Sequence, residues 1–250
     1  MSQTGGGAEQ HMDRTLRVAL SARGVGLVLV GLTLAFGVLG LLAEWLQVQG
    51  HPVALGFSAY FDPAHEGSLP EWYSATIDAL GALVVLLFAW AEPRAALRWR
   101  WALMALLMAG LSAGEATAIL DARLPWLDTL GVAPGAATTW VMRGGGALVL
   151  GVLLVQLVPL FRELGARRTW LAFGCGAVVI LGQSGLGWLG GRMAEWYGQQ
   201  SLAYLLAHVG EETLETLGAA LFLTLALDTL LARGGLVVRR REPATRPVAP

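Results

Sequence analysis

Six long apolar stretches, separated by short polar segments, dominate the pattern of this sequence. They lie at approximately 24–48, 74–92, 101–121, 139–161, 169–190 and 201–232. Each is close to or above the roughly 20 residues that an α-helix needs to cross about 30 Å of hydrocarbon. The pattern therefore predicts an all-α fold, a polytopic membrane helix bundle with six transmembrane helices.

Composition agrees with a membrane location. Of the 250 residues 55% are hydrophobic and only 14% are charged, and the mean hydropathy is +0.58. Soluble globular domains carry about 25% charged residues. A formal net charge of −1 gives no sign of a nucleic-acid partner. The lipid bilayer is therefore the expected partner, and a larger complex or an oligomer stays open.

The arginines predict the orientation of the six helices. Every basic residue is arginine, and 14 of the 17 lie before the first stretch, after the second, after the fourth or after the sixth. Only Arg123 and Arg192 lie in the connections at the other end. Because Arg and Lys are retained on the cytoplasmic side, both termini are expected in the cytoplasm. The ten tryptophans, which fall near the ends of the stretches, support the same boundaries.

Three segments follow from this topology. Residues 1–20 form a cytoplasmic N-terminal tail, residues 21–233 the six-helix transmembrane domain, and residues 234–250 a cytoplasmic tail rich in Arg and Pro. Two G-x-x-x-G pairs, Gly110 with Gly114 and Gly187 with Gly191, predict close contacts between helices.

One polar stripe interrupts the last apolar stretch. In AHVGEETLETLG, residues 207–218, His208 is followed by Glu211, Glu212 and Glu215. At helical spacing these four side chains share an arc of about 100°. A carboxylate at the bilayer centre costs on the order of 2.5–3.5 kcal/mol on insertion scales, so the stripe is expected to face the bundle interior.

Other polar residues are expected at similar depth, in the outer half of the bilayer. They are Glu44, Asp78, Glu115, Asp121, Arg143 and Gln183. The combined cluster predicts an outward-facing site that attracts cations. Either protons or a divalent metal (Fe, Mn or Zn) would suit it, since carboxylates and imidazole bind all three metals.

Roles follow from the side-chain chemistry. Glu115, Glu211, Glu212 and Glu215 are candidate ligands or proton carriers, and His208 a ligand or proton relay. Arg143 would balance their charge. A complete di-iron pattern has two Glu-x-x-His motifs, whereas this chain has a single intramembrane histidine. The expected role is cation binding in sensing or transport.

Two other function classes remain open. A membrane metalloenzyme could act on a lipid or a quinone-like substrate that enters from the outer leaflet. Alternatively, the cluster could be a hydrogen-bonded network inside a non-catalytic accessory subunit of a membrane complex. Catalytic residues are not identified by any motif, and enzymatic activity stays undecided.

At GSLPEWYSATIDALGALVVLLFAW, LSAGEATAILD and HVGEETLETLG the chain resembles a group of uncharacterised bacterial six-helix inner-membrane proteins. The resemblance implies that the first motif opens the second helix, that the third helix carries an acidic residue followed by a His-Glu pair, and that the last carries Glu-Glu-x-x-Glu. Glu115, Asp121, Glu211, Glu212 and Glu215 match, whereas Leu120 stands at the place of the histidine. The resemblance implies a place in the bacterial inner membrane and no activity.

Overall fold

The structure is a computed structural model, and every regular element in its described part is a helix. The described residues are 21–51, 56–63, 65, 67–117, 151–152 and 155–233. The elements are α1 (Ala22–Val48), α2 (Phe57–Phe61), α3 (Leu69–Ala91), α4 (Ala95–Thr117), α7 (Ala166–Ile180), the π-helix η2 (Leu181–Leu186), α8 (Gly187–Tyr197) and α9 (Leu202–Ala232). Residues 155–164 are also helical. The all-α prediction is confirmed for these parts of the chain.

Serine side chains begin three of the long helices. The Oγ atoms of Ser21, Ser68 and Ser201 accept hydrogen bonds from backbone N–H groups in the first turns of α1, α3 and α9. Such a cap satisfies one of the donors that a helix start leaves without an intrahelical partner. The local sequence therefore fixes where each of these helices starts.

Four helical segments in the described residues are long and apolar enough to cross a membrane. They are Ala22–Val48, Leu69–Ala91, Ala166–Tyr197 and Leu202–Ala232. They correspond to the first, second, fifth and sixth predicted spans, although the second begins five residues earlier than the predicted 74. The predicted third span overlaps α4, which is described only to Thr117, and much of the predicted fourth lies outside the described residues. A multi-pass membrane protein is thus supported, while six spans and their orientation stay predictions.

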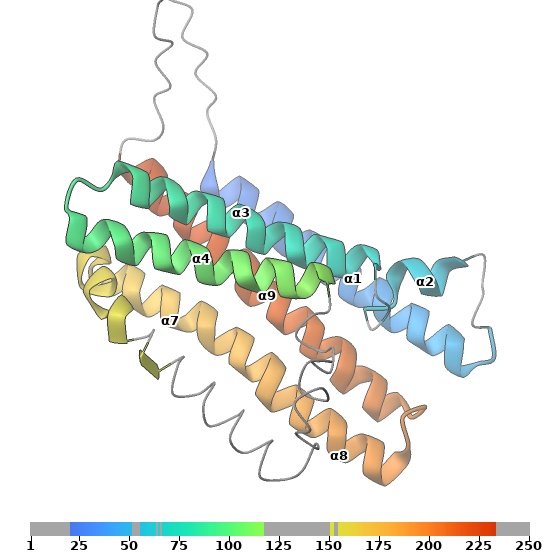
Figure 1. Cartoon of the computed structure of the whole chain (residues 1–250). Coiled ribbons are helices and arrows are strands. Elements are labelled where there is room, and N and C mark those ends of the chain that lie inside the picture. The colour runs from blue at the N-terminus through green and yellow to red at the C-terminus, as the bar shows by residue number, and fades with distance from the viewer. Residues whose placement is uncertain are drawn as a thin grey trace, which may run out of the picture.

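Helix α9 lies at the centre of the described bundle, in contact with α1, α3 and the continuous helix α7–η2–α8 (Figure 1). Helix α4 packs along α3. The core is built from Ile77, Val85 and Phe88 of α3 with Trp101 of α4 and Leu223 of α9. Many large apolar side chains are instead exposed, as on a surface that faces lipid.

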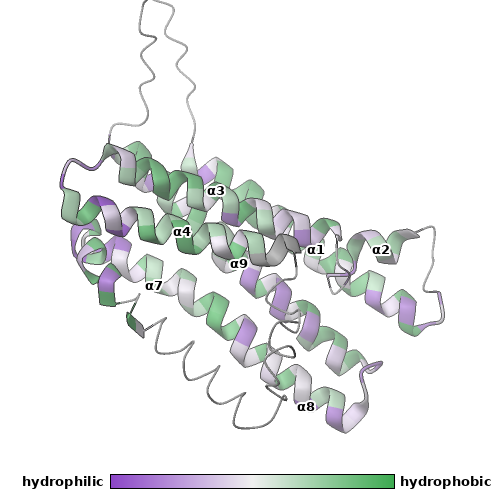
Figure 2. Ribbon diagram, viewed as in Figure 1, coloured by the Kyte–Doolittle hydropathy of each residue, from purple (hydrophilic) through white to green (hydrophobic). Residues whose placement is uncertain are grey.

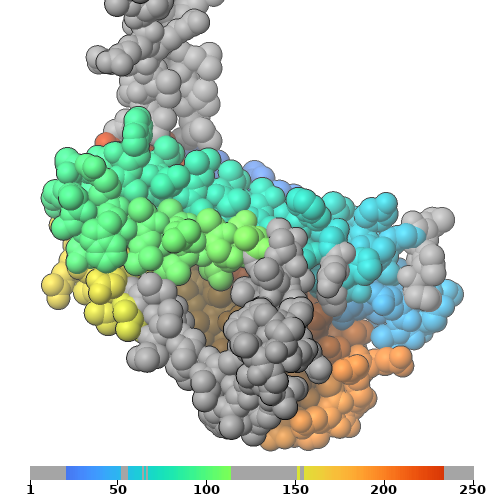
Figure 3. Space-filling model, viewed as in Figure 1, coloured from blue at the N-terminus to red at the C-terminus, as the bar shows by residue number. Residues whose placement is uncertain are grey.

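The long helices place the polar residues at the ends of the bundle. Figure 1 shows the start of α1, the α3–α4 connection, the start of α7 and the end of α9 at one end, which carries the arginine-rich connections. Figure 2 shows hydrophilic residues there, and again in the first half of α9. At the opposite end, Figure 3 shows the end of α1 and α2 on one side and α8 with the start of α9 on the other.

Glycines allow α9 to approach its neighbours, and most of them lie outside the two predicted G-x-x-x-G pairs. A Cβ on Gly218 would lie 2.8 Å from the Cys175 carbonyl oxygen of α7, and one on Gly26 of α1 would lie 2.6 Å from the Cγ2 of Thr224. Nothing among the described residues lies within 4 Å of a Cβ placed at Gly110 or Gly191. Of the predicted glycines Gly187 does lie at a close contact, because a Cβ there would be 2.5 Å from the Glu211 Oε1 of α9, whereas the side-chain surroundings of Gly114 lie outside the described residues.

An ion-pair cluster joins the elements at the arginine-rich end. The Arg94 guanidinium contacts the Glu92 carboxylate at 2.7 Å and the Glu163 carboxylate at 3.0 Å, and Arg98 Nε donates to the Glu92 carbonyl oxygen. Arg233, just after α9, lies over the rings of Phe88 and Trp101. The hydrogen bond from Arg94 holds the pKa of Glu92 below its usual range.

Glu92→Gln is expected to lower the stability of the protein at neutral pH but not in acid. A carboxyl group whose pKa is depressed by folding contributes stability above its unfolded pKa, about 4.3, and loses it as the pH falls through the lower folded value. Thermal unfolding in detergent at pH 7 and below pH 4 would measure the difference. Glu195→Gln, which removes an exposed carboxylate at the other end, is the matched control; an equal loss at both pH values would refute the assignment.

Candidate functional site

A histidine and a glutamate from opposite ends of the sequence meet at the end of the bundle away from the arginines. The His208 Nδ1 of α9 lies 2.8 Å from the Glu44 Oε1 of α1. The side chain of Glu44 is 8% exposed and that of His208 20%. Both residues were predicted for the site, and the structure brings them into direct contact.

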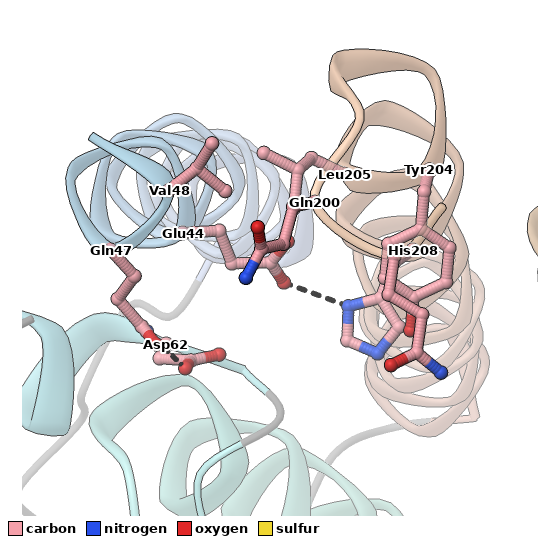
Figure 4. Close-up of a pocket in the computed structure, with 9 residues that line it drawn as sticks. Glu44, Gln47, Val48, Asp62, Gln200, Tyr204, Leu205 and His208 are labelled. Carbon is pink, nitrogen blue, oxygen red and sulfur yellow. Dashed lines mark hydrogen bonds and ion pairs between the residues drawn. The ribbon is translucent and has the colours of Figure 1, made fainter. Parts of the chain in front are cut away.

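Polar side chains surround this pair and line a cavity of about 320 Å³ (Figure 4). The Tyr204 ring stacks on His208, with ring centroids 5.7 Å apart. On the other side Gln47 Nε2 donates to Asp62 Oδ2 at 2.6 Å. Gln199, Gln200, Val48 and Leu205 complete the lining. The cavity thus combines two carboxylates with an imidazole, a phenol and three amides.

The described lining of the cavity holds two carboxylate side chains, Glu44 and Asp62, and one imidazole. Among the described residues no arginine lines the cavity, and the chain has no lysine. The second carboxylate oxygen of Glu44, Oε2, is buried and has no hydrogen-bond partner among the described residues. Because a buried carboxylate oxygen without a partner is costly, a positive or proton-donating group is needed there.

Glu211 and Glu215 lie against a different helix. A Cβ on Gly187 of α8 would lie 2.5 Å from Glu211 Oε1, and one on Gly182 of η2 would lie 3.1 Å from Glu215 Cγ. The two carboxylate side chains therefore pack against the glycine-rich face of η2 and α8, whereas His208 contacts α1. The predicted stripe is a single face of α9, but its members meet two different neighbours.

The segment opposite these glutamates is a π-helix. In η2, Leu181–Leu186, the helix is wound wider, and the Gly187 N–H donates to the Gly182 carbonyl oxygen five residues before it. Such segments are rare and are frequent at functional sites. Gln183, predicted as a supporting residue, lies in η2 with an exposed side chain, and it does not line the cavity.

The remaining predicted residues are placed as follows. Asp78 is buried on α3, and Glu212 is half-buried on α9. Glu115 lies on α4, but its side chain is outside the described residues, as are Asp121 and Arg143 entirely. Within the described residues, no group of three or more His, Cys, Asp or Glu side chains could hold a metal ion. This part of the chain therefore gives no support to the predicted metal site.

Sequence reasoning missed several residues of the cavity. Neither Asp62, which follows α2, nor Gln47, which lies one helical turn after Glu44, was singled out from the sequence. The spacing of Glu44 and Gln47 could have indicated a shared face of α1. No local pattern identifies Asp62, because its place depends on how the connection folds back toward α1.

The chain belongs to the family described as Domain of unknown function (DUF8692), whose model matches residues 24–229. The match covers all four candidate spans almost completely. No curated protein and no solved structure matches the chain. The predicted resemblance to an uncharacterised group is supported by this match, and the description of the family names no activity.

A double-mutant cycle tests the contact between Gly187 and Glu211. Gly187→Ala is expected to destabilise the protein because its methyl group must displace the carboxylate, and Glu211→Ala should relieve most of that loss. The expected coupling in thermal or denaturant unfolding is about 0.5–3 kcal/mol. The control is Gly185→Ala with Glu211→Ala, for which additive effects are expected. Among the described residues a Cβ on Gly185 meets only a leucine methyl, at 4.0 Å. Additive effects in both cycles would show that Glu211 does not lie on Gly187.

Proposed function

We propose that this member of the DUF8692 family is a multi-pass membrane protein that binds a cation in the cavity between α1 and α9. The observation that carries the proposal is the Glu44 carboxylate, which His208 contacts through one oxygen while the other is buried and has no partner among the described residues. Sensing or transport would follow from reversible occupation of such a site.

The surroundings of His208 support a cation over an anion. Glu44 faces it from α1, Glu211 and Glu212 lie near it on α9, and Asp62 lines the same cavity. Among the described residues, three glutamates therefore lie near the imidazole, and a fourth acidic residue lines the same cavity. A positive charge in a poorly solvated site is stabilised strongly by such neighbours, whereas an anion would be repelled by them.

The described residues fit a proton or a molecular cation better than a metal ion. Divalent metals in proteins are usually held by three or four protein ligands, and the described residues do not offer such a set. The predicted ligands Glu211, Glu212 and Glu215 remain candidates for proton binding, because carboxylates inside a membrane often serve as proton carriers.

A panel of cations tests the proposal. The full chain in detergent would be unfolded by heat with added Na⁺, NH₄⁺, Mn²⁺ or Zn²⁺ at constant ionic strength. A bound cation raises the unfolding temperature because it stabilises the folded state. Glu44→Gln should abolish the rise, and Glu163→Gln, at the arginine-rich end, should leave it unchanged. Elemental analysis of the same samples would identify a retained metal. A pH series of the wild type and Glu44→Gln tests the proton. No cation-dependent rise, no retained metal and the same pH dependence of the unfolding temperature in both proteins would together refute the proposal.

The proposed orientation places the cavity outside the cytoplasm. Both termini and the arginine-rich connections would lie in the bacterial cytoplasm, as the charge bias of the connections supports. The cavity, at the opposite end of α1 and α9, would then open to the outer side of the inner membrane.

Cysteine labelling tests this orientation. Cys175 is the only cysteine, so Cys175→Ala gives a background to which Glu195→Cys or Ala95→Cys can be added; both positions are exposed. A membrane-impermeant maleimide added to intact spheroplasts should label Glu195→Cys but reach Ala95→Cys only after lysis. The reverse pattern would show that the cavity faces the cytoplasm.

A further inference from the structure

We infer that the corner between the helix of residues 155–164 and the start of α7 binds an anionic phospholipid. Its phosphate group would lie on two exposed arginines, Arg162 and Arg167, and its acyl chains on the apolar helix faces next to them. The inference is independent of the cavity between α1 and α9, which lies at the opposite end of the bundle.

The two helices pack against each other where the arginines lie. Thr169 Oγ1 of α7 donates a hydrogen bond to the Phe161 carbonyl oxygen at 2.5 Å, and the rings of Phe161 and Phe173 have centroids 5.0 Å apart. Arg162 follows Phe161 directly, and Arg167 lies in the first turn of α7, so both side chains start from one corner. Figure 3 shows this corner in yellow at the surface, beside the α3–α4 connection in green.

The two arginines are available to an anion. The three described acidic side chains at this end are each paired with another arginine, whereas Arg162 and Arg167 are exposed and form no ion pair with a described residue. The paired acids are Glu92 and Glu163, on Arg94, and Asp228, on Arg168. A guanidinium group donates two parallel hydrogen bonds to a phosphate, so two such groups in one corner suit a single phosphate group.

Arg162 lies at the end of an exposed apolar face. At helical spacing Val155, Val158 and Arg162 share an arc of about 60°, and the two valines are 66% and 41% exposed. The valines lie about two turns and one turn before the arginine, toward the middle of the bundle. The order along this face, charge followed by apolar side chains, matches the order from phosphate to acyl chain in a phospholipid.

Helix α7 repeats this arrangement from its own first turn. Arg167, Trp170 and Leu171 share an arc of about 100°, and Trp170 is 74% and Leu171 49% exposed. The helix begins the candidate span Ala166–Tyr197, which places Arg167 and Trp170 at the headgroup level, where tryptophan is enriched. An exposed arginine and an exposed indole one turn apart therefore lie at the depth of a lipid headgroup.

Charge and shape together favour an anionic phospholipid over other anions. The retention of basic residues on one side of a membrane accounts for arginines at this end, but it does not require an apolar face next to each of them. A free phosphate would leave both faces without a partner, and a zwitterionic phospholipid lacks the net negative charge that arginines attract. Each basic residue close to an anionic membrane surface strengthens binding about fivefold.

The test compares two phospholipids with identical acyl chains on the full wild-type chain. The protein, delipidated in detergent, would be incubated with equal amounts of phosphatidylglycerol and phosphatidylcholine, and native mass spectrometry would count the lipid molecules retained. We expect phosphatidylglycerol to be retained at least tenfold more than phosphatidylcholine, because only the first carries a net negative charge. Glycerol 3-phosphate, which has the anion without acyl chains, should not displace it at the same concentration.

Two charge-matched double variants locate the site. Arg162→Gln with Arg167→Gln should lower the retention of phosphatidylglycerol at least tenfold, whereas Arg23→Gln with Arg192→Gln should leave it unchanged. Arg23 and Arg192 are also exposed, but they lie at the start of α1 and in α8. A photoreactive phosphatidylglycerol, with a diazirine near the start of an acyl chain, should attach to residues 155–174 of the wild type, which locates the lipid even if the first double variant does not fold.

Equal retention of the two phospholipids by the wild type would overturn the inference. An equal loss in both double variants would show a diffuse attraction of anions to exposed arginines and would overturn it as well. Displacement of the lipid by glycerol 3-phosphate, or attachment of the photoreactive lipid outside residues 155–174, would have the same consequence. Each of these results leaves the proposed cation site standing, because Glu44 and His208 take no part in the lipid contact.

Discussion

The high free energy of a carboxylate in hydrocarbon constrains the whole bundle. Helix α9 carries His208 and three glutamates within eight residues, and exposing them to lipid would cost several kcal/mol for each ionised group, about 2.5–3.5 kcal/mol even on the mildest scales. The helix therefore has to be surrounded. It lies at the centre of the described elements, with α1, α3 and α7–η2–α8 packed around it, and its polar groups meet α1 on one side and the glycine-rich face of η2 and α8 on the other.

Contact between the two ends of the sequence follows from the same constraint. Glu44 and His208 are separated by 164 positions, yet their side chains lie 2.8 Å apart. Without the other, each would be a largely buried polar side chain that lacks a hydrogen-bond partner. Their contact gives a partner to one oxygen of Glu44 and to one ring nitrogen of His208. What they leave unsatisfied is the second oxygen of Glu44, which is buried and has no hydrogen-bond partner among the described residues.

The sequence predicted the helices better than it predicted the site. Hydrophobic stretches of spanning length have few alternatives in a membrane, and serine caps such as Ser68 and Ser201 mark helix starts locally. The depth of Glu44 and His208 could also be estimated, because the rise of a helix is constant. By contrast, the division of the stripe between two neighbours depends on how α9 is rotated, and the participation of Asp62 depends on a connection. Neither is encoded in periodicity alone, which explains why the sequence did not predict that Glu211 lies against α8 while His208 contacts α1.

The π-helix η2 determines which residue of the α7–η2–α8 helix lies opposite Glu211. Along α7 and α8 the positions that meet α9 include Val179, Gly182, Gly187 and Gly190. Their spacing is three, five and three residues, and the step of five is the one spanned by the π turn. With ordinary helical winding, Leu186 would take the place opposite Glu211, about 100° of rotation earlier, and no glycine would make room for the carboxylate. The wide winding of η2 is therefore as much a part of the acidic face as the glutamates, because it places Gly187 and not Leu186 opposite Glu211. Deleting one residue between Gly182 and Gly187 would let an ordinary α-helix bring the same residues of α8 to the same neighbours, whereas inserting one would turn them away.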